Sequence, residues 1–139
     1  MRSKNLFFLI TLFTSLIAIS SCKNDASINE PVKVEIRLLF PTGKTDTVNV
    51  NDSIRFALVS TANLTFYKDL KKFTVNLSST NGGQNGDIIG VQIKKSEAKT
   101  YTFDRFIKVG NIKCNQNYTF SVRDIDGEEA RVSFPIVVQ

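Results

Sequence analysis

The chain has 13 acidic side chains and many hydroxyl groups but no histidine, and this limits the catalytic chemistry open to it. Histidine is the usual base that activates a serine or cysteine nucleophile, and it is the commonest zinc ligand. A pair of carboxylates can still work as acid and base. The Asp and Glu residues fall in expected turns and on outward strand positions, where a solvated role is ordinary. We therefore expect no enzyme and no cofactor, with a small carboxylate-dependent hydrolase as the most distant alternative.

The densest group of possible metal ligands surrounds Gly127. Asp124, Asp126 and Glu128 could offer oxygens to Ca²⁺, which takes about six to eight oxygen ligands. Their spacing does not follow the EF-hand pattern, and Asp126-Gly127 is also typical of an exposed hairpin turn. The turn is the expected role of this segment, and a calcium site is the weaker alternative.

Phe66 and Tyr67 are the candidate ligand contacts. They lie in a loop-like stretch between Asn63 and Lys68. Exposed aromatic rings can stack on sugars or anchor a protein partner, because they offer a large contact area. The alternative is that one ring enters the core and the other is half covered.

Two short motifs are candidates for modification by sugars. Asp46-Thr47-Val48 and Asp52-Ser53-Ile54 resemble the Asp-Ser/Thr-apolar motif for O-glycosylation in envelope proteins of the Bacteroidota. This resemblance implies sugars on Thr47 and Ser53.

The N-terminal segment has the layout of a secretory signal. Arg2 and Lys4 precede a mostly apolar run of 14 residues, 6–19, and the small pair Ser20-Ser21 precedes Cys22. The run is shorter than the ~20 residues that span a bilayer. Residues 19–22 resemble the lipobox of a bacterial lipoprotein signal, which implies cleavage before Cys22 and lipid attachment to its sulfur. An ordinary cleaved signal that leaves Cys22 as a free thiol is the alternative.

These features divide the chain into three parts. Residues 1–21 are the expected signal peptide, residues 22–30 the lipidated cysteine with a flexible polar tether, and residues 31–139 the folded domain. Lys23-Asn24-Asp25 resembles the short charged export signals of surface lipoproteins in the Bacteroidota. The resemblance implies an outer-membrane lipoprotein of the cell envelope, exposed at the surface. The 18 basic residues are scattered rather than clustered, so we expect no nucleic-acid partner.

Apolar residues alternate with polar ones over eight short stretches, a pattern typical of half-buried strands. The pattern predicts an antiparallel sandwich, and no stretch has a sustained helical period. Asp126-Gly127 predicts a tight primed turn with positive φ at both central residues. Phe106 and Ile107 break the alternation, which predicts a bulge or a bend, and Pro135 should lie on an edge or face outward. The eight stretches are 32–38, 48–50, 54–58, 73–77, 89–93, 101–103, 118–122 and 132–138.

Four segments in the same order resemble small immunoglobulin-like, or PKD-like, lipoprotein domains of the Bacteroidota. They are residues 51–56, 70–75, 118–127 and 133–138. The resemblance implies an all-β, immunoglobulin-like antiparallel sandwich of about seven to eight strands after the cleaved signal. It places Tyr118 at a tyrosine corner and Phe120 where antibody domains have a disulfide cysteine. The chain lacks the tryptophan of antibody domains, and a lipidated Cys22 would leave Cys114 without a disulfide partner.

We expect a non-catalytic, lipid-anchored domain that binds or spaces a partner protein or a glycan at the bacterial surface. The lipid anchor makes the membrane a further partner. The alternative is a structural accessory subunit of an outer-membrane assembly. Fold resemblance supports the architecture more strongly than it supports either function.

Overall fold

The computed structural model describes residues 34–62 and 68–139, which form eight strands and one turn of 3-10 helix, η1 (Lys95–Glu97). The predicted signal peptide, Cys22 and the tether lie outside the described residues, as do Phe66 and Tyr67. In chain order the strands are β1 (Val34–Phe40), β2 (Asp46–Val48), β3 (Ser53–Ala62), β4 (Leu70–Ser79), β5 (Gly86–Gln92), β6 (Thr100–Lys108), β7 (Cys114–Asp124) and β8 (Glu129–Val138).

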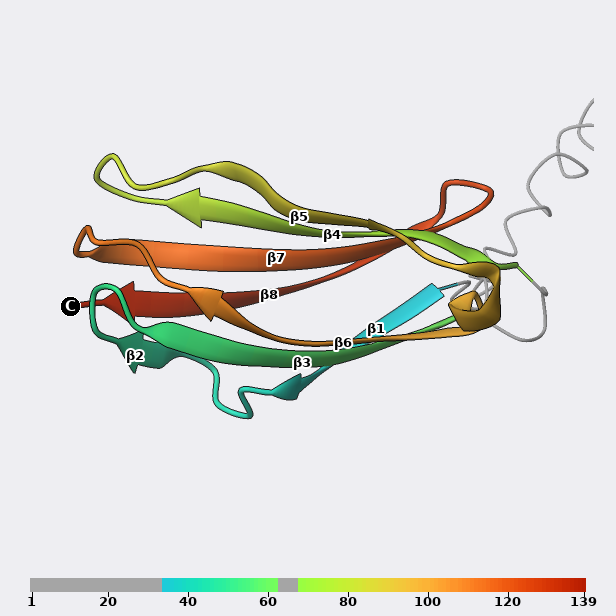
Figure 1. Cartoon of the computed structure of the whole chain (residues 1–139), viewed down its shortest axis with the longest axis horizontal. Helices are drawn as coiled ribbons and strands as arrows, with labels where there is room; N and C mark the ends of the chain where they lie inside the picture. Colours follow the sequence, from blue (N-terminus) through green and yellow to red (C-terminus); the bar gives the residue numbers. More distant parts are fainter. Residues whose placement is uncertain (1–33, 63–67) are drawn as a thin grey trace, which may run out of the picture. The chain divides into compact units, whose positions relative to one another are not determined.

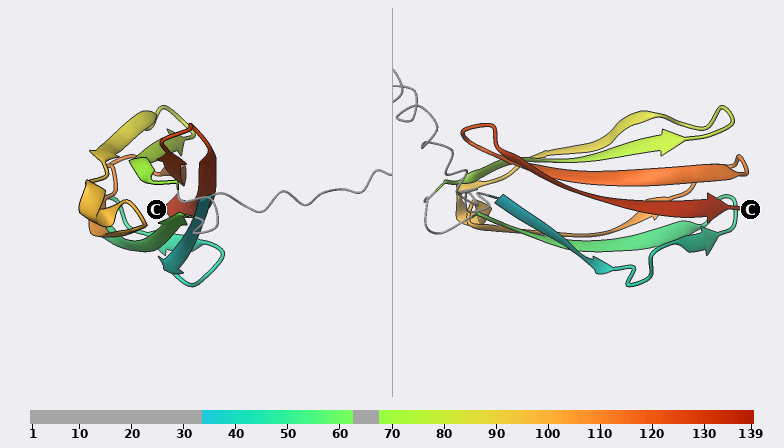
Figure 2. Two further views of the ribbon diagram at one scale, coloured as in Figure 1. Left: turned by 90° about the vertical axis from the view of Figure 1, so that its right-hand side faces the viewer. Right: turned by 180° about the vertical axis from the view of Figure 1, so that it is seen from behind.

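The strands form two facing sheets (Figure 1). One sheet has the order β1-β3-β6, and the other has the order β2-β8-β7-β4-β5. Two further views show the same two layers from the end and from behind (Figure 2). This arrangement confirms the predicted two-sheet sandwich. It also has the immunoglobulin-like feature that consecutive strands cross repeatedly between sheets rather than staying within one.

All neighbouring strands are antiparallel except one pair, which the sequence pattern did not predict. β2 pairs with β8 in parallel, with Thr47 opposite Val137. β1 and β2 run in the same direction but belong to different sheets (Figure 1). Pro41, which follows the last residue of β1, cannot donate a ladder hydrogen bond, and the chain crosses to the other sheet after it.

Aromatic rings fill the space between the sheets. Phe56, Phe73, Phe103 and Phe120 are each at most 2% exposed. The Phe56 and Phe120 rings, from opposite sheets, lie 4.9 Å apart between centroids. The resemblance to immunoglobulin-like domains implies that this contact stands where antibody domains have a disulfide. Burying each such side chain contributes about 1.5–3 kcal/mol, so ring packing joins the two sheets.

Tyr118 is fully buried at the position expected for a tyrosine corner. Its hydroxyl donates a 3.0 Å hydrogen bond to Oε1 of Gln116, which is itself buried. Tyrosine corners usually bond to the backbone upstream, so this chain uses a side chain in place of the peptide group. Burial raises the pKa of Tyr118 to about 12, because the charged phenolate would be poorly solvated there.

The hairpin between β7 and β8 forms where expected, but the predicted primed turn is wrong. Only Gly127 has a positive φ, 94°, and Asp126 does not. Residues 125–128 make a longer loop in which the Asp124 carbonyl accepts the Gly127 N–H. Asp124 explains the difference, because its carboxylate Oδ1 accepts the N–H groups of Asp126 and Glu128, each at 2.9 Å. These bonds hold the wider loop.

The predicted bulge at Phe106 is also wrong. β6 pairs with β3 without a register shift from Thr100 to Lys108, and Arg55 stands opposite Phe106. The alternation continues with Arg105 in an inward position near the rim, while Phe106 faces outward and is 72% exposed. Pro135 is exposed, as predicted, and lies just before the part of β8 that pairs with β2.

Candidate functional site

The outward side chains of the five-stranded sheet form an ordered polar grid. Strand register places them in rows across β5, β4, β7 and β8. Neighbouring strands are about 4.8 Å apart, and successive outward residues on one strand are about 6.7 Å apart. The first row is Gln92, Lys72, Arg123 and Glu129; the second is Gly90, Thr74, Ser121 and Arg131; the third is Asp87, Asn76, Thr119 and Ser133.

Short hydrogen bonds fix the middle of this grid. The Thr74 and Ser121 hydroxyl oxygens lie 2.6 Å apart, and those of Thr119 and Ser133 lie 2.9 Å apart. At the β5 edge, the Asn76 amide donates to Asp87 Oδ1 at 3.1 Å. Such cross-strand pairs contribute roughly 0.2–1 kcal/mol each. They also hold hydroxyl and amide groups at fixed positions on an open surface.

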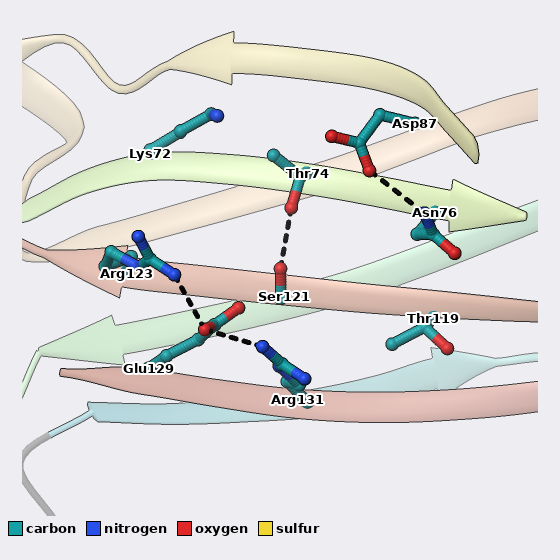
Figure 3. A pocket seen from close by; sticks show the side chains of 9 residues that line it. All are labelled: Lys72, Thr74, Asn76, Asp87, Thr119, Ser121, Arg123, Glu129 and Arg131. Carbon is teal, nitrogen blue, oxygen red and sulfur yellow. Dashed lines mark hydrogen bonds and ion pairs between the residues drawn. The ribbon is translucent and has the colours of Figure 1, made fainter. Parts of the chain in front are cut away.

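Two arginines converge on one carboxylate at the β7–β8 side of the grid (Figure 3). Arg123 and Arg131 each place one terminal nitrogen on Glu129 Oε2, at 3.0 and 2.9 Å. The Glu129 side chain is 19% exposed. Hydrogen bonding from Arg131, helped by Arg123, lowers the pKa of Glu129 to about 2. Glu129 is therefore ionised throughout the physiological pH range.

The grid is hollowed into a groove of about 410 Å³. All nine residues that line it are polar or charged, and they come from four strands. Figure 3 shows Lys72 and Arg123 near one end, Arg131 in the middle beside Ser121, and Asp87 and Asn76 near the other end. The lining residues are Lys72, Thr74, Asn76, Asp87, Thr119, Ser121, Arg123, Glu129 and Arg131. Gly90 borders the same face, and a Cβ added there would meet nothing within 4 Å.

The outer face of the three-stranded sheet carries a different set of groups. Arg55 binds Asp104 with two hydrogen bonds, at 2.9 and 2.7 Å. The Arg55 guanidinium also lies 5.8 Å from the centre of the Phe40 ring. Leu39, Phe40 and Phe106 are 43%, 42% and 72% exposed. We call Leu39, Phe40, Arg55, Asp104 and Phe106 the aromatic strip.

The calcium candidates do not point at a common site. Asp124 is 1% exposed; its Oδ1 holds the turn, and its Oδ2 has no hydrogen-bond partner among the described residues. The Asp126 carboxylate instead lies 2.6 Å from the Lys68 ammonium. Across residues 34–62 and 68–139, no three acidic or cysteine side chains are grouped so that they could hold a metal ion. Asp124 here shapes the loop that carries Glu128.

The other predicted residues fall into two groups. Thr47 and Ser53 are exposed, on β2 and at the start of β3, so both are accessible to modification, which stays a prediction. Cys114 is buried and forms no disulfide with any described residue. Cys22, Phe66 and Tyr67 lie outside the described residues, and their roles also stay predictions. Within the described segments, no helix is long and apolar enough to cross a membrane.

Neither outer face is predicted by a motif in the sequence. Thr74, Ser121 and Arg131 belong to different strands, and only the strand register brings them together. One usable signal was the alternation itself, because it assigns Lys72, Thr74 and Asn76 to a single outward row of β4. Unbroken alternation along this strand would also have predicted that Phe106 is exposed.

Comparisons with known proteins give little beyond the architecture. No family model matches the chain, and no curated protein matches it. A similar solved structure is a chain in the complex of zinc 2-glycoprotein and prolactin inducible protein from human seminal plasma. It is 13% identical, covers 78% of this chain and 95% of that chain, and has a TM-score of 0.44. The strand order, sheet composition and core described above define the chain as an immunoglobulin-like β-sandwich.

Proposed function

We propose that this protein is a non-catalytic, lipid-anchored module of the bacterial envelope that binds a glycan on the outer face of its five-stranded sheet. One observation carries the proposal. The groove on this face is lined entirely by hydroxyl, amide and charged groups, and the Thr74, Ser121 and Thr119 hydroxyls are held by cross-strand contacts. Preorganised donors and acceptors suit a ligand that is itself covered with hydroxyl groups.

The chemistry of the groove favours binding over catalysis. A carboxylic acid that protonates a leaving group needs a raised pKa, so that it keeps its proton near neutral pH. Arg131 and Arg123 have the opposite effect on Glu129 and lower its pKa to about 2. The Thr74 and Ser121 hydroxyls bond to each other, and the chain has no histidine that could activate them.

The lipid anchor rests on the sequence at Cys22. Several acyl chains hold a protein stably on a membrane, since each buried CH₂ contributes about 0.8 kcal/mol. Cys22→Ala should release the protein from membranes into the soluble fraction while leaving the fold unchanged. A variant that stays with the membrane although it carries no lipid would contradict the anchor.

Glycan binding can be tested by blocking the groove without disturbing the core. Gly90→Trp places a large ring next to Thr74 on the groove side, where a new Cβ meets no atom within 4 Å. Thr102→Trp, at an exposed outward position on β6, is the matched control. Full-length protein in detergent should bind one or more envelope or plant polysaccharides. Gly90→Trp should lose this binding and Thr102→Trp should keep it. Equal binding by both variants would show that the groove is not the glycan-binding site.

A structural accessory subunit is the second candidate, and the aromatic strip favours it. Exposed aromatic and arginine side chains are enriched where proteins bind one another. Phe106 at 72% exposure and Phe40 beside Arg55 have this composition. Crosslinking in cells followed by purification should recover one stoichiometric envelope protein, and Phe106→Ser should abolish its recovery. If Phe106→Ser recovers the same protein in the same amount, the strip is not its docking surface.

A further inference from the structure

The positive charge in the groove is concentrated and only partly neutralised. Lys72 on β4 stands directly opposite Arg123 on β7. Like charges at directly opposed positions repel each other and destabilise the pair. Lys72 makes no ion pair or hydrogen bond through its side chain among the described residues. An arrangement of this kind is relieved by an anion placed between the two groups.

Glu129 neutralises only part of this positive charge. It binds both arginines through one oxygen, so the four groups Lys72, Arg123, Arg131 and Glu129 together carry an excess of positive charge. Each guanidinium has five N–H donors in a planar fork, and each uses one terminal nitrogen on Glu129. Donors therefore remain for a second acceptor. Asp87, the other carboxylate of the groove, bonds to Asn76 near the opposite end (Figure 3).

The hydroxyl groups continue from this positive end along the grid. Ser121 stands opposite both Thr74 and Arg131, one row from Lys72 and Arg123. Rows are about 6.7 Å apart, so a ligand longer than one sugar ring can contact more than one row. A glycan could therefore place an acidic group between Lys72 and Arg123 of the first row and Arg131 of the second, and hydroxyl groups along the second and third rows.

We infer that the groove selects acidic polysaccharides, with Lys72, Arg123 and Arg131 forming a subsite for the carboxylate or sulfate of one sugar unit. Arginine forks match both anions with paired N–H donors, and lysine adds a point charge. This inference rests on the proposed glycan-binding function and narrows its ligand to one chemical class.

The test compares acidic with neutral polymers and uses full-length protein in detergent. Polygalacturonate offers carboxylates, dextran sulfate offers sulfates, and dextran, inulin and galactomannan are neutral. We expect binding to at least one acidic polymer at least tenfold tighter than to any neutral one. The tighter of the two acidic polymers identifies the preferred anion. Binding should weaken steeply as salt rises from 0.1 to 1 M, because the screening length falls from about 10 to about 3 Å.

Two neighbouring lysines provide a matched pair of variants. Lys72→Gln should lower affinity for the acidic polymer about tenfold, because a charge-assisted hydrogen bond is roughly twice as strong as a neutral one. Lys71→Gln removes the same charge one residue away, outside the groove lining, and should change affinity less than about twofold. Arg131→Gln should match Lys72→Gln. Thermal unfolding of each variant separates loss of binding from loss of fold.

The outcomes distinguish the proposed anionic subsite from the proposed glycan-binding function. Neutral and acidic polymers bound equally would overturn the anionic subsite and leave glycan binding intact. If Lys72→Gln and Lys71→Gln bind the acidic polymers equally well, the anion binds elsewhere. This result would also overturn the subsite. No binding to any of the five polymers or to isolated envelope polysaccharide would overturn the proposed function itself.

Discussion

The two sheets of this sandwich share one core but differ in the exposed aromatic rings that they present to solvent. The five-stranded sheet carries hydroxyl, amide and charged groups paired across β4, β7 and β8. The three-stranded sheet carries the exposed rings of Phe40 and Phe106 beside the Arg55–Asp104 pair. Their ion pairs differ as well, because Glu129 is 19% exposed whereas Asp104 is 47% exposed. One face is thus preorganised for a hydrophilic ligand, while the other has the composition of a protein contact.

The largest contrast should come from two phenylalanines on the same strand. Phe103 is 2% exposed and packs on Phe73, with ring centroids 4.9 Å apart, whereas Phe106 is 72% exposed. Phe103→Ala should lower the free energy of unfolding by about 3–5 kcal/mol. Phe106→Ala should change it by less than about 0.5 kcal/mol. Urea unfolding of both variants measures the difference, and similar losses would show that Phe106 is covered in the folded protein.

The next contrast compares the carboxylates of the two faces. Glu129→Gln removes the negative charge that two arginines share and should cost about 1–2 kcal/mol, after allowance for the exposure of both guanidinium groups. Asp104→Asn removes a pair whose partners are both about half exposed, so a smaller loss is expected. Thermal unfolding at low salt measures both losses. A larger loss for Asp104→Asn would mean that the Asp104 ion pair stabilises the protein more than the Glu129 ion pairs do.

Acid should weaken the five-stranded face in a defined range. The pKa of Glu129 falls from its usual 4.5 to about 2 on folding, so the unfolded chain takes up its proton first. The stabilisation from Glu129 is therefore complete above about pH 4.5 and is lost as the pH falls towards 2. Stability curves of wild type and Glu129→Gln should converge over this range. Parallel curves would mean that Glu129 is not held by the arginines.

Much of the fold could be predicted from the sequence, because alternation reports which side of a strand is buried. Residues 118–122 and 132–138 fall within β7 and β8, and the loop at Gly127 joins them. The turn geometry could not be predicted, because it depends on hydrogen bonds from the Asp126 and Glu128 N–H groups to the buried Asp124 carboxylate. The parallel pairing of β2 with β8 was also beyond reach, because nothing in three residues specifies their partner.

The candidate site was less predictable than the fold. Lys72, Ser121 and Arg131 become neighbours only through the register of three strands. Sequence inspection favours compact motifs, and it therefore selected Asp124, Asp126 and Glu128, which share a turn but not a ligand site. A grid assembled from single residues on separate strands leaves no local motif to find.

The smallest contrast concerns the hydroxyl pairs. Thr119→Val removes the 2.9 Å contact with Ser133 and replaces the hydroxyl with a methyl group of similar size. We expect a loss of about 0.5 kcal/mol in stability and a measurable loss of glycan affinity. Thr102→Val, on the outer face of β6, should leave glycan affinity unchanged. An equal effect of both variants on binding would mean that the Thr119 hydroxyl does not contact the ligand.

The most direct test of the account is amide and side-chain chemical-shift mapping of the protein during titration with the tightest-binding polysaccharide. The account predicts that the perturbed residues cluster on the five-stranded sheet, around Thr74, Ser121 and Arg131, and that Arg55 and Phe106 are unaffected. Perturbations centred on the aromatic strip, with the groove residues unchanged, would contradict it.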